Sequence, residues 1–379
     1  MAGRTIDIVA AGPPSPDLHD PAAPAWALAA GLAASGHSVQ VTYPGSADPP
    51  APAPAGVAAV PFSPVTAHVG TALGDAELAR AAARHLRANS QAVVRDPSGL
   101  GALGHHAGHR PVVAFVRSLS AEEASPPAGT GPRLAGRLFA WGERRGVRRL
   151  EKEALAEATV VCCATVAQRD RLRDDYGVAA ARLRIVASAV APGPDPPSRE
   201  AARRSLTVPD DVPLAVALPP AESEATAAAV SPIVEAFRRT RPIFTGARLA
   251  VVGTAETYGA GISSVPERDA ATVGRAVAAA DVVVVTSPGP AVDPTLVLAL
   301  RAGAAVVVAP EVDLGEGADA TVRRSPLADP GELASVLAEL FADPEERRVQ
   351  GEKGRAFARR FDPAELAREL EGAGAFGPS

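Results

Sequence analysis

Short apolar runs alternate with helix-forming stretches along the whole chain. Near the amino terminus, residues 5–10 predict a strand, residues 25–34 a helix and residues 36–42 a second strand. This order is typical of a parallel sheet, because parallel strands need a long crossover connection between them. The same alternation predicts further strands at residues 92–95, 111–116, 159–164 and 183–187, and a helical, arginine-rich stretch at 133–157.

A second alternating series follows a stretch that is dense in proline, at residues 191–212. Such a composition is typical of a boundary between domains. The second series predicts strands at 214–218, 248–253, 281–285 and 304–309 and helices at 225–239 and 294–302, followed by a helical closing segment. We therefore expect an α/β domain at 1–190, a linker at 191–212, a second α/β domain at 213–362, and a C-terminal helix and tail at 363–379 that is a candidate for packing back on the first domain.

Composition fits two domains with aliphatic cores. The chain has 379 residues, of which 47% are hydrophobic and only 4% are aromatic. This length is enough for two separate cores. A formal net charge of −5, with 21% charged residues, gives no basic excess, so nucleic acid is not an expected partner.

The two cysteines and the apolar runs bear on where the protein works. Cys162 and Cys163 are neighbours in a predicted buried strand, where adjacent side chains point to opposite faces, so we expect them to be reduced. The first apolar run contains Asp7 and ends at Gly12, which is unlike a signal peptide. No apolar run reaches the length of about 18 residues that spans a bilayer. We expect a cytoplasmic protein.

Residues 280–310 carry a pattern with a family resemblance. An Ala-Asp pair ending at Asp281 precedes an apolar strand, a loop, a helix, Gly303 and another apolar strand. This order resembles the donor-binding loop and helix of retaining family 4 glycosyltransferases. Further matches are the Gly36-His37 turn, the segments 151–163 and 174–177, and the closing helices at 333–360.

The resemblance implies the GT-B fold, in which two doubly wound Rossmann-like domains face each other across a cleft. It implies that the first domain lies on the acceptor side and the second on the donor side. The activity it implies is transfer of a sugar from a nucleotide-sugar donor to an acceptor. The nucleotide sugar would be a substrate, and no cofactor or metal is expected.

The chain departs from the family pattern at the positions that carry its chemistry. Two glutamates of the family, one near the donor sugar and one on the ribose, fall on Pro290 and Leu298. The family's Gly-Gly before the first helix falls on His19 and Asp20, and its histidine after the strand at 111–116 falls on Arg117. These three residues, Arg117, His19 and Asp20, are the catalytic candidates.

The donor diphosphate also lacks its usual cations. The family has an Arg and a Lys after the first strand of the second domain, but this chain has Glu222 and Glu224 in that region. The only lysines, Lys152 and Lys353, lie elsewhere. An arginine from another loop could replace them, and the candidates are Arg301, Arg268 and Arg117.

A helix that starts at Pro294 offers the remaining anion-binding device, since free amides at a helix N-terminus favour phosphate. Asp293 is the expected N-cap, and its carboxylate would itself occupy those amides. The donor-site candidates are Gly253, Thr254, Glu267, Arg268, Ser287, Gly289, Asp293 and Thr295.

For two other clusters we favour a structural interpretation over a functional one. His105, His106 and His109 lie on a glycine-rich connection with no supporting carboxylate or cysteine, so we expect a solvated loop and no metal site. The basic stretch 133–149 is amphipathic, which permits peripheral contact with an anionic membrane, but a solvated helix face is the favoured reading.

Two functions remain open on the sequence alone. The first is a family 4-like glycosyltransferase with a degenerate donor site. The second is a catalytically inactive pseudo-glycosyltransferase that acts as a scaffold or activator of a partner transferase. A sensor that binds a nucleotide or sugar without turnover is disfavoured by the same missing cations. Fold analogy cannot decide among them.

Overall fold

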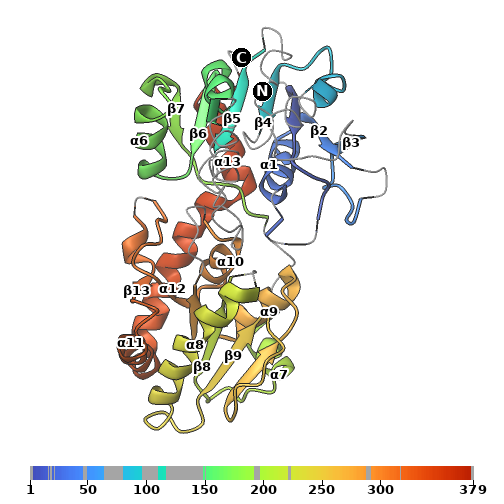
Figure 1. The fold of residues 1–379 in the computed structure, drawn as a ribbon. Coiled ribbons are helices and arrows are strands. Elements are labelled where there is room, and N and C mark those ends of the chain that lie inside the picture. The colour runs from blue at the N-terminus through green and yellow to red at the C-terminus, as the bar shows by residue number, and fades with distance from the viewer. Residues whose placement is uncertain are drawn as a thin grey trace, which may run out of the picture. The chain divides into compact units, whose positions relative to one another are not determined.

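The computed structural model describes residues 3–15, 17, 19–20, 22–45, 49–63, 80–95, 110–116, 148–149, 151–191, 197–220, 223–286, 292–315 and 317–376. The chain forms two compact units. The first unit contains residues 1–15, 20–191 and 361–379, and the second contains residues 16–19 and 192–360. Each unit is built on one parallel sheet (Figure 1).

The first unit has a seven-stranded sheet in the order β3-β2-β1-β4-β5-β6-β7, and all its paired strands are parallel. The strands are β1 (Thr5–Val9), β2 (Ser38–Pro44), β3 (Val57–Phe62), β4 (Ala92–Arg95), β5 (Val112–Val116), β6 (Val160–Cys163) and β7 (Leu183–Ile185). The strands predicted in this unit are thus confirmed.

The helices of the first unit that the structure describes in full are α1 (Ala23–Ala34), α6 (Val166–Asp174), the 3-10 turn η1 (Ala180–Arg182) and α13 (Pro363–Gly372). Helix α13 lies beside α1, although the two are far apart in sequence (Figure 1). A Cβ atom at Gly31 would lie 2.1 Å from the Pro363 carbonyl oxygen, so the close packing of these helices needs glycine there.

The second unit has a six-stranded sheet in the order β10-β9-β8-β11-β12-β13, again with parallel pairing. The strands are β8 (Leu214–Leu218), β9 (Arg248–Val252), β10 (Ile262–Val265), β11 (Val282–Val285), β12 (Ala305–Val308) and β13 (Arg323–Arg324). Strands β8, β11 and β12 are buried along their whole length and are made almost entirely of Val, Ala and Leu, as expected when helices cover both faces.

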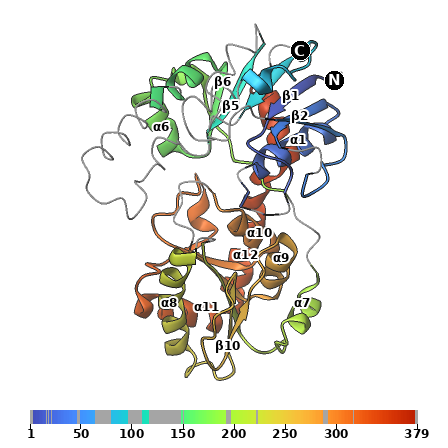
Figure 2. The same ribbon diagram turned by 45° about the vertical axis from the view of Figure 1, so that its right-hand side comes forward.

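The helices of the second unit that the structure describes are α7 (Arg199–Ser205), α8 (Ser223–Thr240), α9 (Ala270–Ala279), α10 (Pro294–Ala302), α11 (Pro330–Ala342) and α12 (Pro344–Ala358), with 3-10 turns η2 (Ala318–Ala320) and η3 (Arg359–Phe361). Helices α9 and α10 pack on one face of the sheet, while α8 and α11 pack on the other (Figure 2). Within this unit, the carboxyl ends of all the strands meet at one edge of the sheet.

Candidate functional site

The start of α10 lies at the carboxyl edge of the second sheet, immediately after β11 and its loop. Asp293 is the N-cap, and its Oδ1 accepts hydrogen bonds from the Thr295 backbone N–H and hydroxyl, each at 2.7 Å. Pro294 occupies the first turn, so the predicted helix start is confirmed. The Asp293 carboxylate occupies the first free amide of this helix.

Asp293 is ionised and almost fully shielded from solvent. Burial alone would raise its pKa, but the contacts with His19 and Thr295 outweigh burial and lower the pKa to about 2. His19 Nε2 lies 3.5 Å from Asp293 Oδ1, which is within ion-pair distance but falls short of a well-formed hydrogen bond. The N-terminus of α10 therefore already holds a negative charge that belongs to the protein.

Arg268 follows β10 and reaches across the ends of two neighbouring strands. Its Nη1 donates a hydrogen bond of 3.1 Å to the carbonyl oxygen of Pro220, just after β8. Its stem and guanidinium cover Gly253 at the end of β9, where an added Cβ would lie 2.4 Å from Arg268 Cδ. Gly253 has φ +85°, a conformation that glycine adopts at no steric cost.

The charge of Arg268 is set by burial and by two carboxylates. Burial lowers its pKa, and the charges of Asp293 and Asp17 act in the opposite direction. Arg268 thus places a cation beside the turn that follows β8, a turn whose own sequence contains no Arg or Lys. Among the predicted donor-site residues that the structure describes, Arg268 is the one whose cation lies at the end of β8.

Three buried polar atoms along this edge have no hydrogen-bond partner in the part of the chain that the structure describes: Arg268 Nε, Thr286 Oγ1 and Ser325 Oγ. Each residue lies within three positions of the end of its strand, after β10, β11 and β13 respectively. Buried polar atoms are nearly always paired with protein or with bound molecules, so this concentration marks the edge as a candidate ligand site.

The other donor-site candidates have varied positions. Thr254 is hydrogen-bonded within its own loop, since its Oγ1 lies 3.3 Å from Tyr258 Oη and accepts from the Glu256 N–H. Glu267 is exposed beside Arg268. Ser287 and Gly289 lie outside the described residues, as do Pro290 and the catalytic candidate Arg117.

The structure separates His19 from Asp20. His19 approaches Asp293, whereas Asp20 Oδ1 accepts a hydrogen bond of 2.7 Å from the Ala22 N–H, before α1. The two side chains thus make different contacts, and Asp20 serves the start of a helix.

Leu298 and Arg301 are part of α10, but they lie away from the carboxyl edge of the second sheet, where this helix starts. Leu298, where the family has its second glutamate, is 6% exposed and packs in the hydrophobic core. Arg301 is in the last turn of α10. At 1.5 Å per residue it lies about 10 Å from the helix start, so it is remote from that edge. The side chains of Glu222 and Glu224 lie outside the part that the structure describes.

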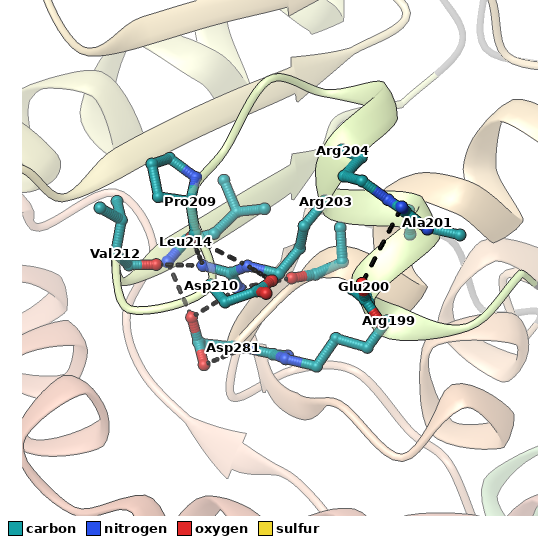
Figure 3. Close-up of polar contacts among 12 residues, drawn as sticks. Arg199, Glu200, Ala201, Arg203, Arg204, Pro209, Asp210, Val212, Leu214 and Asp281 are labelled. Atoms are coloured by element: carbon teal, nitrogen blue, oxygen red, sulfur yellow. Dashed lines mark hydrogen bonds and ion pairs between the residues drawn. The ribbon is translucent and has the colours of Figure 1, made fainter.

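The Asp of the Ala-Asp pair has a different role, at the amino end of β11 (Figure 3). Asp281 Oδ2 accepts a hydrogen bond of 2.9 Å from the Leu214 N–H and lies 3.3 Å from Nη1 of Arg203. Arg199 Nη2 donates to Asp281 Oδ1 at 2.8 Å. Asp281 thereby joins the start of β8 to helix α7, which is a structural role at the edge opposite to the candidate site.

The first unit contains an apolar cavity of about 30 Å³. Ile8 of β1, Val94 of β4 and Phe115 of β5 contribute to its lining, together with Leu28 and Leu366 from α1 and α13. It lies where the strand order reverses between β1 and β4, the usual place for a ligand in such sheets. Arg95 at its rim is buried and donates to the Ala154 carbonyl oxygen, and burial lowers its pKa to about 10.

The cysteines are free and buried, as predicted. They belong to different core clusters, on opposite faces of the first sheet. Burial raises the pKa of Cys163 to about 11 and that of Cys162 further, so neither is a thiolate at neutral pH. Within the described residues, no cluster of three His, Cys, Asp or Glu side chains could bind a metal ion, and no helix has the length and apolarity to cross a bilayer. His105, His106, His109 and nearly all of the 133–149 stretch lie outside those residues.

One protein family matches most of the first unit. The family model of Glycosyltransferase Family 4 matches residues 25–193. Residues 25–193 thus resemble a domain of this glycosyltransferase family. No curated protein matches the chain as a whole or in part.

Several solved structures resemble this chain over nearly its whole length. The sucrose-phosphate synthase of Thermosynechococcus elongatus has 16% identity and a TM-score of 0.68, covering 97% of this chain and 98% of its own. WaaG, a glycosyltransferase of lipopolysaccharide biosynthesis, has 19% identity and a TM-score of 0.66 over 99% of this chain and 100% of its own. The HepE protein of Anabaena in complex with UDP has 13% identity and a TM-score of 0.64, over 97% and 98%. The two units thus have the GT-B fold.

Proposed function

We propose that this protein is a glycosyltransferase that takes a sugar from a nucleotide donor and binds the donor at the carboxyl edge of its second sheet. The family 4 match and the GT-B fold support this class of activity. The acceptor would lie on the first unit, near the switch point of its sheet between β1 and β4.

The observation that carries the proposal is the row of unpartnered polar atoms at that edge. Arg268 Nε, Thr286 Oγ1 and Ser325 Oγ are shielded from water and bind nothing in the described chain. Leaving a buried donor or acceptor unpaired costs about 1–3 kcal/mol. A polar ligand that reaches these atoms would recover that free energy, and the carboxyl edge of a doubly wound sheet is where such ligands bind.

The donor site is altered relative to the family, and this shapes the expected activity. Leu298 offers no oxygen for the ribose hydroxyls, and the Asp293 carboxylate opposes a diphosphate at the start of α10. We therefore propose weak donor binding, in which a cation from another loop offsets part of this loss.

The test is a panel of UDP-, ADP- and GDP-sugars, first by thermal shift and then by product analysis. A ligand that binds only the folded state raises the melting temperature, by an amount that grows with its concentration relative to Kd. We expect at least one donor to raise the melting temperature at millimolar concentration and to release its nucleoside diphosphate when an acceptor is present. No shift with any donor would contradict the proposal.

A second function is favoured by two observations, the burial of Leu298 in the core and the self-capping of α10 by Asp293. A chain with these features could act as a non-catalytic scaffold or activator of a partner transferase. In that case no donor would be turned over, and an active transferase would co-purify with this protein and lose activity without it. A transferase that neither co-purifies nor changes activity would exclude this alternative.

The setting we propose is cytoplasmic and reducing, supported by the two free, buried cysteines. Nucleic acid is not among the proposed partners, because the net charge is −5. Contact of the 133–149 stretch with an anionic membrane stays a less favoured prediction.

A further inference from the structure

We infer that Arg268 is the residue that binds the diphosphate of the donor, in place of the cations that this chain lacks after β8. The inference rests on the proposed function, because it names the group that would hold the donor within the same site. It assigns to the β10–α9 connection a role that the resemblance places on the β8–α8 connection.

The geometry of Arg268 fits an anion rather than a purely structural contact. Its described protein hydrogen bond is to the Pro220 carbonyl oxygen, and that oxygen also accepts from the Thr226 hydroxyl at 2.8 Å. Nε is buried with no partner. A guanidinium has five N–H donors in a rigid fork that matches phosphate oxygens, so most of this fork remains available.

The backbone around Arg268 is adapted to hold it in this place. Gly253 lets the stem pass directly over the end of β9, and any side chain there would collide with Arg268 Cγ, Cδ and Nη1. Pro220 supplies its carbonyl at the end of β8. The guanidinium is thus positioned over the ends of two central strands by groups that are part of the sheet edge.

The carboxylates near Arg268 permit an anionic ligand to bind there, but they lower its affinity. Asp293 and Asp17 both act on Arg268, so the cation is already partly balanced. A nucleoside diphosphate carries more negative charge than either carboxylate, and it would compete with them for the guanidinium. Weak binding is the expected consequence.

The experiment is calorimetric titration of the full-length protein and its variants with UDP, ADP, GDP and inorganic pyrophosphate. We expect Arg268→Gln to weaken binding of the preferred nucleotide and of pyrophosphate by about tenfold or more, since hydrogen bonds to charged groups are the strong ones. Arg268→Lys keeps the charge but not the fork, so we expect an intermediate loss. The matched control is Arg275→Gln, because Arg275 on α9 binds Thr272 away from the strand ends.

The outcomes distinguish a failure of the inference alone from a failure of the proposed function. If wild type and Arg268→Gln bind the nucleotide equally well, Arg268 is not the diphosphate ligand, although the proposed function survives. If the wild-type protein binds none of the four probes, both fall. Should Arg268→Gln fail to fold, the Nε–H signal of Arg268 in ¹⁵N-labelled wild type, assigned with Arg268→Lys, provides the test. A shift of that signal on nucleotide binding supports the inference, and an unchanged signal in the bound protein overturns it.

Discussion

Asp293 combines a structural role with an effect on the charge at the start of α10. Its side chain supplies the N-cap of α10 and so performs a structural task. The same carboxylate puts a negative charge at the point where a phosphate would meet free amides. The sequence predicted this conflict from the order Asp293-Pro294-Thr295, because capping is a local property that neighbouring residues determine.

A pH prediction follows from the low pKa of Asp293. Its folded pKa of about 2 lies below the ordinary value of 3.8, so its contribution to stability is present above about pH 4 and is lost as the pH falls through about 2. We expect the difference in unfolding free energy between wild type and Asp293→Asn to change by about 2 kcal/mol, against wild type, between about pH 5 and about pH 2. Urea unfolding at a series of pH values measures this, and parallel curves for the two proteins would contradict it.

From the sequence, Arg268 is only one of three arginine candidates for the role of the missing cations. Its selection depends on the fold, because the loop after β10 is brought beside the ends of β8 and β9 only by the strand order. No local pattern encodes that contact. The unpartnered atoms of Thr286 and Ser325 could not be foreseen for the same reason, since burial of a hydroxyl depends on distant residues.

At the scale of elements, α7 is tied to the second sheet by a buried ion pair (Figure 3). Arg203 is completely buried, contacts Asp281 and donates to the carbonyl oxygens of Pro209, Val212 and Ala279. All of the guanidinium's nitrogens are thereby engaged. A buried charge without its partner is costly, so this cluster stabilises the connection between the linker and the sheet only as a complete set.

We expect Arg203→Met to lower the free energy of unfolding of the second unit by about 3–5 kcal/mol, because three buried carbonyl oxygens would lose their donor and Asp281 would lose one of its arginine partners. The matched control is Arg204→Met, whose side chain is 73% exposed and lies 3.9 Å from Glu200. A surface change of that kind costs about 0.5 kcal/mol or less. Urea unfolding compares the two, and equal stability of the variants would show that the cluster is not an anchor.

Most elements could be predicted from apolar periodicity, and those that were missed had weak patterns. Strands such as β8 and β11 are continuous runs of Val, Ala and Leu. Strand β3, at one edge of the first sheet, contains Pro61, which a central strand would not tolerate. Strand β10, at one edge of the second sheet, reads Ile-Ser-Ser-Val and has few apolar residues. Helix α9 had a usable signal, since Asp269 caps it through the Ala271 and Thr272 N–H groups.

At the scale of the whole molecule, the fold is shared with proteins of very different sequence. Solved glycosyltransferases with 13–19% identity match nearly the whole chain. A framework of buried aliphatic strands tolerates such divergence because any residue of similar volume can fill it. Charged ligand-binding groups have no such freedom, yet here the cation at the strand ends comes from a different loop. The central claim is that this edge still binds a nucleotide diphosphate.

Hydrogen exchange measured by mass spectrometry, with and without millimolar UDP, ADP or GDP, tests this claim most directly. Binding at a ligand concentration ten times Kd should slow exchange by about tenfold where the ligand stabilises the backbone. We predict protection in peptides that cover residues 218–226, 252–258 and 264–270, around Pro220, Gly253 and Arg268. Exchange that is unchanged with all three nucleotides, or protection that spares these peptides, would contradict the account.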